Sequence, residues 1–234
     1  MKMKNKEAEQ FEDRQKHREQ MKTNRRAEPN LKRTAPQLKE NPLILIVCEG
    51  KNTEPSYFRQ FRLSSATIEA VGEGHNTVSL IKRAKQLEGE KQYDQIWCVF
   101  DKDKFSNNVF NKAIRQAQNR GYGIAYSNQS FEYWLILHFN DHQGGGMDRK
   151  DYNEKINKLI EPFQVTYDGE GSKIITEDFF ALLDGKDEKT GKERVDLAIQ
   201  RAEKIDSRLS HTNPAKEESS TTVFKLVKEL LKYR

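Results

Sequence analysis

The hydrophobic residues of this chain gather in short runs that alternate with amphipathic segments. Residues 43–48 (LILIVC) and 94–100 (DQIWCVF) are nearly continuous apolar runs rich in β-branched side chains, a pattern typical of strands covered on both faces. Weaker runs at 67–71 and 122–126 predict two more strands. Apolar residues at helical spacing follow each of the four runs. The sequence therefore predicts an α/β fold with a mostly parallel sheet and right-handed crossovers.

The pattern changes after the three glycines at 144–146. Beyond them, apolar residues recur at helical spacing in four runs separated by polar turns, at roughly 149–161, 176–184, 193–206 and 221–233. We predict three parts: a basic arm over residues 1–42, an α/β catalytic domain over 43–140, and a mainly helical subdomain over 141–234 that packs on it.

The arm carries the net charge of the chain. Residues 1–42 contain twelve Lys and Arg against seven Asp and Glu, an excess of five that equals the formal net charge of the whole chain. With so few apolar residues, the arm cannot bury enough surface to offset the entropy lost on ordering. It is interpreted either as a solubilising tail or as a segment attracted to the phosphates of nucleic acid.

The sequence contains no apolar run of about 18 residues, and its basic start lacks the apolar centre of a secretory signal. We therefore expect a cytoplasmic protein with no membrane contact. Cys48 and Cys98 lie within apolar runs, where reduced thiols that pack as small hydrophobic groups are expected. Trp97 and Trp134 also lie in apolar runs, and both are predicted to be core residues rather than platforms for nucleobases.

Three acidic residues follow the two strongest predicted strands. Glu49 comes directly after the first strand, and Asp101 and Asp103 follow the third at a spacing of two, which in extended backbone turns both side chains to the same side. If the two strands are neighbours, the three carboxylates converge, and their mutual repulsion favours a bound cation. Carboxylate oxygens suit Mg²⁺ or Mn²⁺. Such an ion can support phosphoryl transfer, with Glu49 acting as a ligand or as a general base.

Each of these signals has an ordinary explanation when taken alone. An Asp-x-Asp sequence is common in surface loops, and Glu-Gly after a strand is a common turn. Their joint position at the carboxyl ends of two strong strands favours a functional site, because ligands bind at that edge of open α/β sheets.

Four segments of the chain resemble the RloB-like family, prokaryotic proteins linked with restriction loci and abortive phage resistance. They are VCEGKNTEPSYF, VFDKDKF, SNQSFEYWLILHF and the late NPAKEESSTTVFKLV stretch. The first two also look like the Glu and Asp-x-Asp motifs of Toprim domains, so the resemblance implies a Toprim-like α/β domain. It further implies a catalytic or metal-binding role for Glu49, Asp101 and Asp103. It also adds Glu54 and Glu132 as catalytic candidates. Gln129 stands where the family usually has proline or a similar turn residue.

Five other residues are candidates for contact with nucleic acid: Lys51, Thr53, His75, Lys102 and Lys104. The free N–H groups of a helix that starts near Thr53 can meet a phosphate. His75 is alternatively a polar loop residue, and Lys102 and Lys104 alternatively neutralise the acidic turn. Glu132 has an ordinary explanation too, because a carboxylate at the start of a helix favours the helix dipole.

Together these features predict a Mg²⁺- or Mn²⁺-dependent endonuclease that hydrolyses phosphodiester bonds of RNA, including transfer RNA, or of DNA as the effector of an anti-phage defence system. The alternative is a non-catalytic Toprim-like adaptor that binds nucleic acid or a partner ATPase. The sequence has no GxxxxGK[ST] motif, so energy-dependent sensing would come from an ATPase partner encoded at the same locus. RNA and DNA remain open as substrates, as do oligomeric state and metal count.

Overall fold

The computed structural model describes residues 12–22, 41–72, 77–103, 105–148 and 150–234. The chain divides into two units, residues 1–40 and residues 41–234. In the first unit the structure describes one exposed helix over residues 12–22. The second unit contains the sheet and every candidate site residue that the structure describes.

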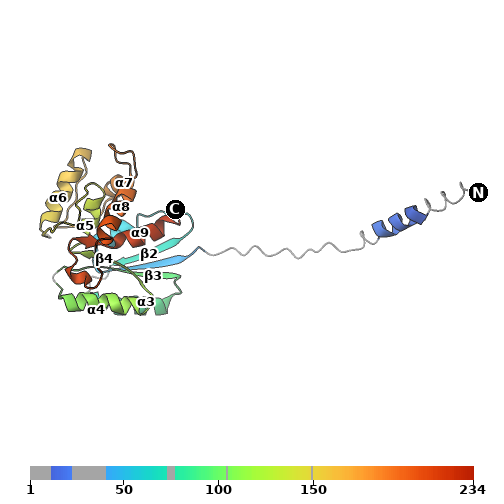
Figure 1. Cartoon of the computed structure of the whole chain (residues 1–234), viewed down its shortest axis with the longest axis horizontal. Coiled ribbons are helices and arrows are strands. Elements are labelled where there is room, and N and C mark those ends of the chain that lie inside the picture. Colours follow the sequence, from blue (N-terminus) through green and yellow to red (C-terminus); the bar gives the residue numbers. More distant parts are fainter. Residues whose placement is uncertain (1–11, 23–40, 73–76, 104, 149) are drawn as a thin grey trace, which may run out of the picture. The chain divides into compact units, whose positions relative to one another are not determined.

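A five-stranded sheet forms the centre of the second unit (Figure 1). Its strands are β1 (Leu43–Cys48), β2 (Thr67–Gly72), β3 (Gln95–Asp101), β4 (Gly123–Asn128) and β5 (Ser220–Thr221), in the order β2-β1-β3-β4-β5. The first four strands are parallel, and β5 pairs antiparallel with β4. The predicted α/β fold and its four strands are confirmed. The pattern did not predict β5, because two polar residues carry no apolar run.

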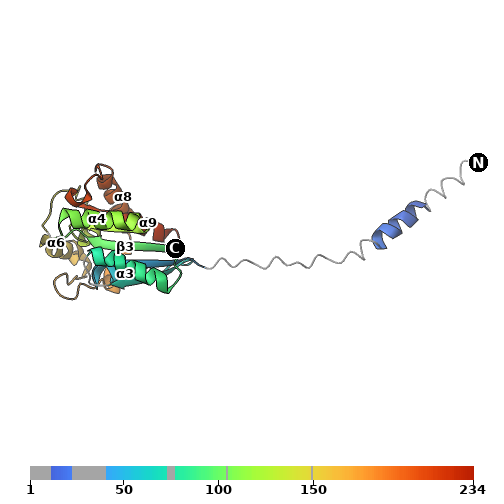
Figure 2. The same cartoon turned by 90° about the horizontal axis from the view of Figure 1, so that it is seen from below.

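Two helices cover one face of the sheet, α3 (Thr77–Glu90) and α4 (Asn107–Gln118), which lie side by side in Figure 2. Side chains that alternate along the strands pack against them, among them Val47 and Phe100. The aromatic ring of Phe110 on α4 meets the rings of Phe100 and Tyr126 edge to face. This apolar layer buries the alternate strand positions, as the continuous apolar runs require.

The opposite face carries a thicker helical layer (Figure 1). Helices α2 (Thr53–Phe58), α5 (Glu132–Leu137) and α9 (Val223–Leu231) contact the strands. Helices α6 (Asp151–Ile160) and α7 (Glu177–Asp184) pack outside them, and α8 (Arg194–Asp206) packs on α5 and α9 and also contacts β5. Single turns of 3₁₀ helix lie at Glu161–Phe163 and Pro214–Lys216. The indole N–H of Trp134 donates to the Tyr57 hydroxyl at 3.0 Å, which satisfies both groups inside the core.

The two cysteines and one of the two tryptophans lie where the sequence predicts them. Cys48 and Cys98 are free and buried as predicted, and Trp134 is fully buried. The expectation that Trp97 is a core residue holds only in part, because its side chain is partly exposed. Within the described segments, no helix has the length and apolar composition needed to cross a membrane.

Neither α2 nor α5 has a side-chain cap hydrogen bond at its amino end. Helix α2 starts at Thr53 itself, and the preceding Asn52 makes no side-chain cap hydrogen bond. Ser130 precedes α5 by two positions, and its hydroxyl donates to the Glu132 carboxylate instead of accepting a backbone N–H group. The Asn52 amide donates instead to the Ser172 carbonyl, so both polar side chains bond to groups other than the first N–H groups of their helices.

Candidate active site

The carboxyl ends of β1 and β3 place Glu49 and Asp101 next to each other. The two strands are neighbours, as predicted, with Cys48 opposite Val99. The backbone N–H of Glu49 donates to the Val99 carbonyl at 2.9 Å, and the Glu49 Oε2 accepts the backbone N–H of Asp101 at 3.3 Å. The Glu49 side chain therefore lies across the end of β3.

Asp101 and Asp103 reach the site by different backbone conformations. Asp101 is the last residue of β3, and its Oδ2 accepts the backbone N–H of Phe131 at 3.1 Å. At Asp103 the backbone has left the strand, with a φ of 35°, and its N–H donates to the Gln129 carbonyl at 3.1 Å. The expectation that extended backbone aligns the two aspartates is therefore wrong. Both still line one pocket, because the turn folds Asp103 back toward it.

Glu54 is a buried carboxylate held under the turn that follows β1. Its side chain is 5% exposed, and its Oε1 accepts the backbone N–H of Gly50 at 3.2 Å. A Cβ atom on Gly50 would lie 2.1 Å from the Glu54 Oε2, so a larger residue at Gly50 must displace the carboxylate. Gly72 at the end of β2 is similarly confined, since a Cβ there would lie 2.7 Å from the Gly50 carbonyl oxygen.

Glu132 is held by two hydroxyl groups. The Ser130 hydroxyl donates to its Oε2, and the Tyr167 hydroxyl donates to its Oε1 at 2.9 Å. The Tyr167 oxygen also lies 3.4 Å from the Thr53 Oγ1. Burial raises the pKa of Tyr167, and the negative charge of Glu132 raises it further, so the phenol keeps its proton and remains a donor.

These side chains surround one pocket of about 240 Å³. Its lining contains five carboxylate residues: Glu49, Glu54, Asp101, Asp103 and Glu132. They come from the ends of two strands, the first turn of α2 and the start of α5. The structure therefore brings all five predicted catalytic residues together.

Lys173 joins the same pocket from the helical half of the chain. It ends a turn in which the Asp168 carboxylate accepts the N–H groups of Gly171 and Ser172 at 2.8 and 2.7 Å, contacts that lower the pKa of Asp168. The turn docks beside α2, since the Asn52 amide donates to the Ser172 carbonyl at 2.8 Å. Sequence reasoning missed both Lys173 and Tyr167, because neither lies in a motif near the strands.

The predicted nucleic-acid contacts divide into three groups. Lys51 and Thr53 line the pocket, with Lys51 exposed and Thr53 buried. Lys102 does not line it, because its ammonium donates to the Phe105 carbonyl. His75 and Lys104 lie outside the described residues.

The donor set of the pocket consists of carboxylate oxygens, which suit a hard cation such as Mg²⁺. In the part of the chain that the structure describes, no three His, Cys, Asp or Glu side chains are already drawn close enough to hold a metal ion. The nearby Cys48 thiol is not a competing ligand. Burial raises its pKa well above the ordinary value, and the charges of Glu54 and Asp101 add to the rise.

The fold and pocket define an α/β protein with an acidic site at the carboxyl edge of a mostly parallel sheet. Residues 44–230 match the family model described as RloB-like protein, and the chain belongs to this family. The chain matches no curated protein and no solved structure.

Proposed function

We propose that this protein is a Mg²⁺- or Mn²⁺-dependent nuclease that hydrolyses phosphodiester bonds. The observation that carries the proposal is the convergence of five carboxylate residues from four separate sequence segments on one pocket. Such a concentration of negative charge is costly unless a cation offsets it, and acidic clusters of this kind serve metal-assisted phosphoryl transfer.

Glu49, Asp101 and Asp103 are the proposed metal-binding residues, since they lie at the ends of the two central strands. When bound, Mg²⁺ would supply positive charge to a phosphate group and to the attacking water. The ends of β1 and β3 fix the backbone of Glu49 and Asp101, and the N–H bond to Gln129 holds Asp103 in the following turn. The Glu after the first strand and the Asp-x-Asp after the third also resemble the Toprim motifs, which supports this assignment.

Glu54 and Glu132 are proposed to act from the walls of the pocket. Each is less than a tenth exposed and is held by a donor, the Gly50 N–H for Glu54 and the Tyr167 hydroxyl for Glu132. Fixed carboxylates of this kind can orient the water or accept its proton. Lys51 and Lys173, on the same pocket, are proposed to bind the substrate phosphate.

The substrate class follows from the proposed chemistry and from the family resemblance. We propose a nucleic acid, RNA (including transfer RNA) or DNA, with residues 1–42 adding non-specific attraction to its phosphates. The same proposal includes a role in anti-phage defence in the cytoplasm, which rests on the family resemblance. It also includes a partner ATPase, because the sequence has no GxxxxGK[ST] motif. Sequencing the RNA and DNA ends produced in cells that express the protein with its genomic neighbours would identify the substrate.

The test compares Asp101→Asn with Asp178→Asn on labelled RNA and DNA in Mg²⁺ or Mn²⁺. Asp101→Asn keeps the shape of the side chain and removes one charge from the pocket, whereas Asp178 is an exposed residue in the first turn of α7. We expect cleavage by the wild type and by Asp178→Asn, and a loss of at least about a hundredfold in Asp101→Asn. Cleavage that survives Asp101→Asn would remove Asp101 from the active site. Nucleic-acid binding without metal-induced stabilisation would favour the adaptor function.

A further inference from the structure

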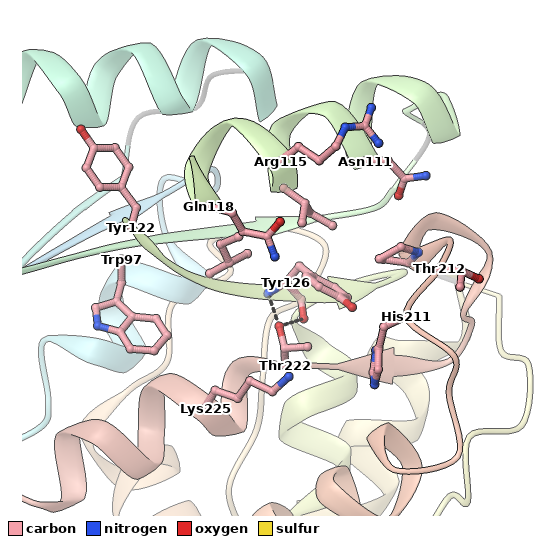
Figure 3. A pocket seen from close by; sticks show the side chains of 13 residues that line it. Trp97, Asn111, Arg115, Gln118, Tyr122, Tyr126, His211, Thr212, Thr222 and Lys225 are labelled. Atoms are coloured by element: carbon pink, nitrogen blue, oxygen red, sulfur yellow. Dashed lines mark hydrogen bonds between the residues drawn. The ribbon is translucent and has the colours of Figure 1, made fainter. Parts of the chain in front are cut away.

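A second cavity, separate from the acidic pocket, lies along the outer edge of β4. Its volume is about 520 Å³, within the range of small-ligand sites, and it shares no lining residue with the acidic pocket. Figure 3 shows that side chains from α4 and α9 lie on either side of β4. Among the lining residues are Trp97, Arg115, Tyr126, His211 and Lys225. We refer to this cavity as the β4 groove.

The backbone of β4 presents one donor and one acceptor to the groove. The outward-facing backbone groups of Tyr126 bond to Thr222. The Tyr126 N–H donates to the Thr222 Oγ1 at 2.8 Å, and the Tyr126 carbonyl accepts the Thr222 N–H at 2.8 Å. Backbone groups alternate along a strand, so those of Ile124 point the same way. Strand β5 pairs only with Ser127 and Asn128, and no strand in the described part of the chain pairs with Ile124 on this side.

The available edge is too short for an added β-strand. Thr222 already occupies the backbone groups of Tyr126, and the N–H of Tyr122 donates to the Ala117 carbonyl at 3.1 Å. Ile124 alone is left with an adjacent donor and acceptor, whereas strand addition uses several residues in succession. A single donor and acceptor side by side suits the hydrogen-bonding edge of a nucleobase.

Trp97 forms an aromatic wall of the groove. Its indole lies across Gly123, where a Cβ atom would come within 2.3–2.6 Å of the ring, so only glycine lets the ring reach over β4 to the edge. The indole N–H donates to the Gln95 Oε1 at 3.0 Å, and the Gln95 amide donates in turn to the Glu229 Oε1 of α9 at 2.9 Å. These contacts fix the ring before a ligand arrives, which favours stacking of a planar base.

The groove carries two cationic side chains and no carboxylate. Arg115 and Lys225 line it together with His211. Asp206 lies 3.3 Å from the Lys225 ammonium and 3.8 Å from His211, so the charge of Lys225 is partly offset. Arg115 is exposed and forms no ion pair with any described carboxylate, which makes it the cation best placed to meet an anion.

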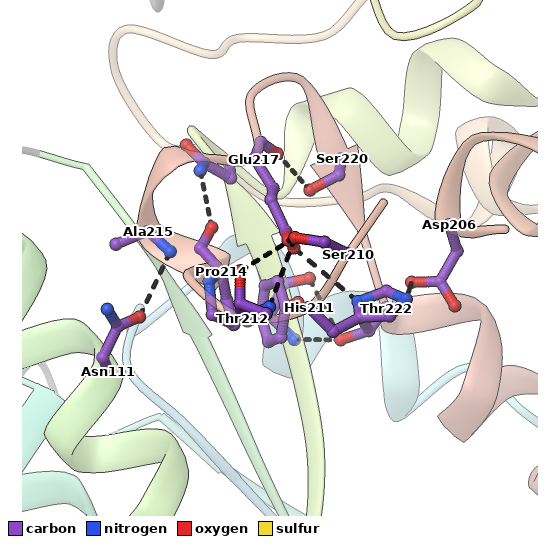
Figure 4. Close-up of polar contacts among 12 residues, drawn as sticks. Asn111, Asp206, Ser210, His211, Thr212, Pro214, Ala215, Glu217, Ser220 and Thr222 are labelled. Atoms are coloured by element: carbon purple, nitrogen blue, oxygen red, sulfur yellow. Dashed lines mark hydrogen bonds and ion pairs between the residues drawn. The ribbon is translucent and has the colours of Figure 1, made fainter. Parts of the chain in front are cut away.

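The end of the groove nearest β5 is closed by the segment between α8 and β5 (Figure 4). This segment is tied to α4, because the Asn111 amide donates to the Asn213 Oδ1 at 2.8 Å and the Ala215 N–H donates to the Asn111 Oδ1 at 3.2 Å. Further bonds inside the segment, such as the one between Ser210 and Thr212, hold its loop together. The groove is therefore bounded at this end by ordered polar structure.

We infer that the β4 groove binds a nucleotide unit, with the base against Trp97, the base edge on the Ile124 backbone, and the phosphate near Arg115. The ligand chemistry is a planar, hydrogen-bonding base joined to a phosphate. It is supplied either by a free nucleotide or by one nucleotide of a single-stranded nucleic acid. This inference does not depend on the proposed nuclease activity, because it concerns a different cavity and its test needs no metal.

The experiment measures binding to the full chain in chelator, with the four ribonucleoside 5′-monophosphates and the four single-base RNA tetranucleotides as probes. The chain has two tryptophans, and Trp134 is fully buried, so a base that stacks in the groove should quench the emission of Trp97. We expect saturable quenching in the wild type and none in Trp97→Phe. By equilibrium dialysis, Arg115→Gln should weaken binding about fivefold, the loss of one partly exposed charged contact. Lys112→Gln, an exposed cation on the same helix that does not line the groove, should bind as the wild type does.

Tighter binding of a tetranucleotide than of its mononucleotide would assign the groove to a nucleic-acid strand, and equal affinity would assign it to a free nucleotide. The inference is overturned if no probe gives saturable quenching up to about 1 mM, a concentration that corresponds to roughly 4 kcal/mol of binding free energy. It is also overturned if Arg115→Gln and Lys112→Gln bind equally well. Arg115 is exposed, so its variant tests the site without disturbing the core.

Discussion

Tyr167→Phe removes the hydroxyl group that holds Glu132, one of the residues that line the acidic pocket. That hydroxyl donates to the Glu132 Oε1 at 2.9 Å, and both side chains are less than a tenth exposed. A buried charged acceptor that loses a donor costs about 1–3 kcal/mol, and the 3.4 Å contact with the Thr53 Oγ1 adds little. We therefore expect the free energy of unfolding to fall by about 2 kcal/mol. The melting temperature should fall by roughly 4–8 °C for a folded unit of this size.

A matched control is a tyrosine whose carboxylate acceptor is exposed. Tyr122 donates its hydroxyl to the Glu88 Oε2 at 2.6 Å, but Glu88 is exposed and water can replace the lost donor. Tyr122→Phe should cost less than about 1 kcal/mol. Urea unfolding followed by circular dichroism gives both values. If the two variants lose the same stability within about 0.5 kcal/mol, the buried Tyr167–Glu132 contact does not hold the pocket wall as we describe.

Four further predictions follow from the same structure. In chelator, Asp103→Asn should melt at or above the wild-type temperature, because one of the mutually repelling charges is removed. The variant should lose cleavage and most of the stabilisation that Mg²⁺ gives the wild type. A lower melting temperature with an intact metal response would make Asp103 a structural residue. Gly50→Ala should keep the fold but abolish cleavage, because its Cβ displaces the Glu54 carboxylate, and a fully active variant would exclude Glu54 from the reaction. Burial lowers the pKa of His138 to about 3 from an ordinary 6.5, so between these values the unfolded chain binds a proton that the folded chain does not. The free energy of unfolding should then fall by up to about 1.4 kcal/mol per pH unit as the pH drops from 6 to 4. In urea titrations at each pH, His138→Gln should flatten this slope. An unchanged slope would contradict the lowered pKa of His138. Removal of residues 1–40 should leave the melting temperature unchanged while weakening nucleic-acid binding and flattening its dependence on salt, and an unchanged salt slope would make the arm a solubilising tail.

The sequence by itself determined the strands that carry the site. The run at 43–48 corresponds to β1 residue for residue, because a strand buried on both faces needs continuous apolar side chains. Parallel strands end at a common edge, so the positions of Glu49 and Asp101 could be inferred without coordinates. Glu54 and Glu132 entered through the family resemblance, since a buried carboxylate near a helix start carries no distinctive local signal.

Only the tertiary structure decided which distant residues complete the two cavities. Tyr167 and Lys173 lie more than a hundred residues from Glu49. The Asp168 turn brings Lys173 to the acidic pocket, and the Tyr167 hydroxyl reaches Glu132, one of the residues that line it. The β4 groove depends equally on long-range pairing, because the two-residue strand β5 leaves Ile124 unpaired on its outer side among the described residues. Local sequence patterns report burial and periodicity along one segment. The packing of separate segments depends on the free energy of the whole core, and a single sequence does not display it.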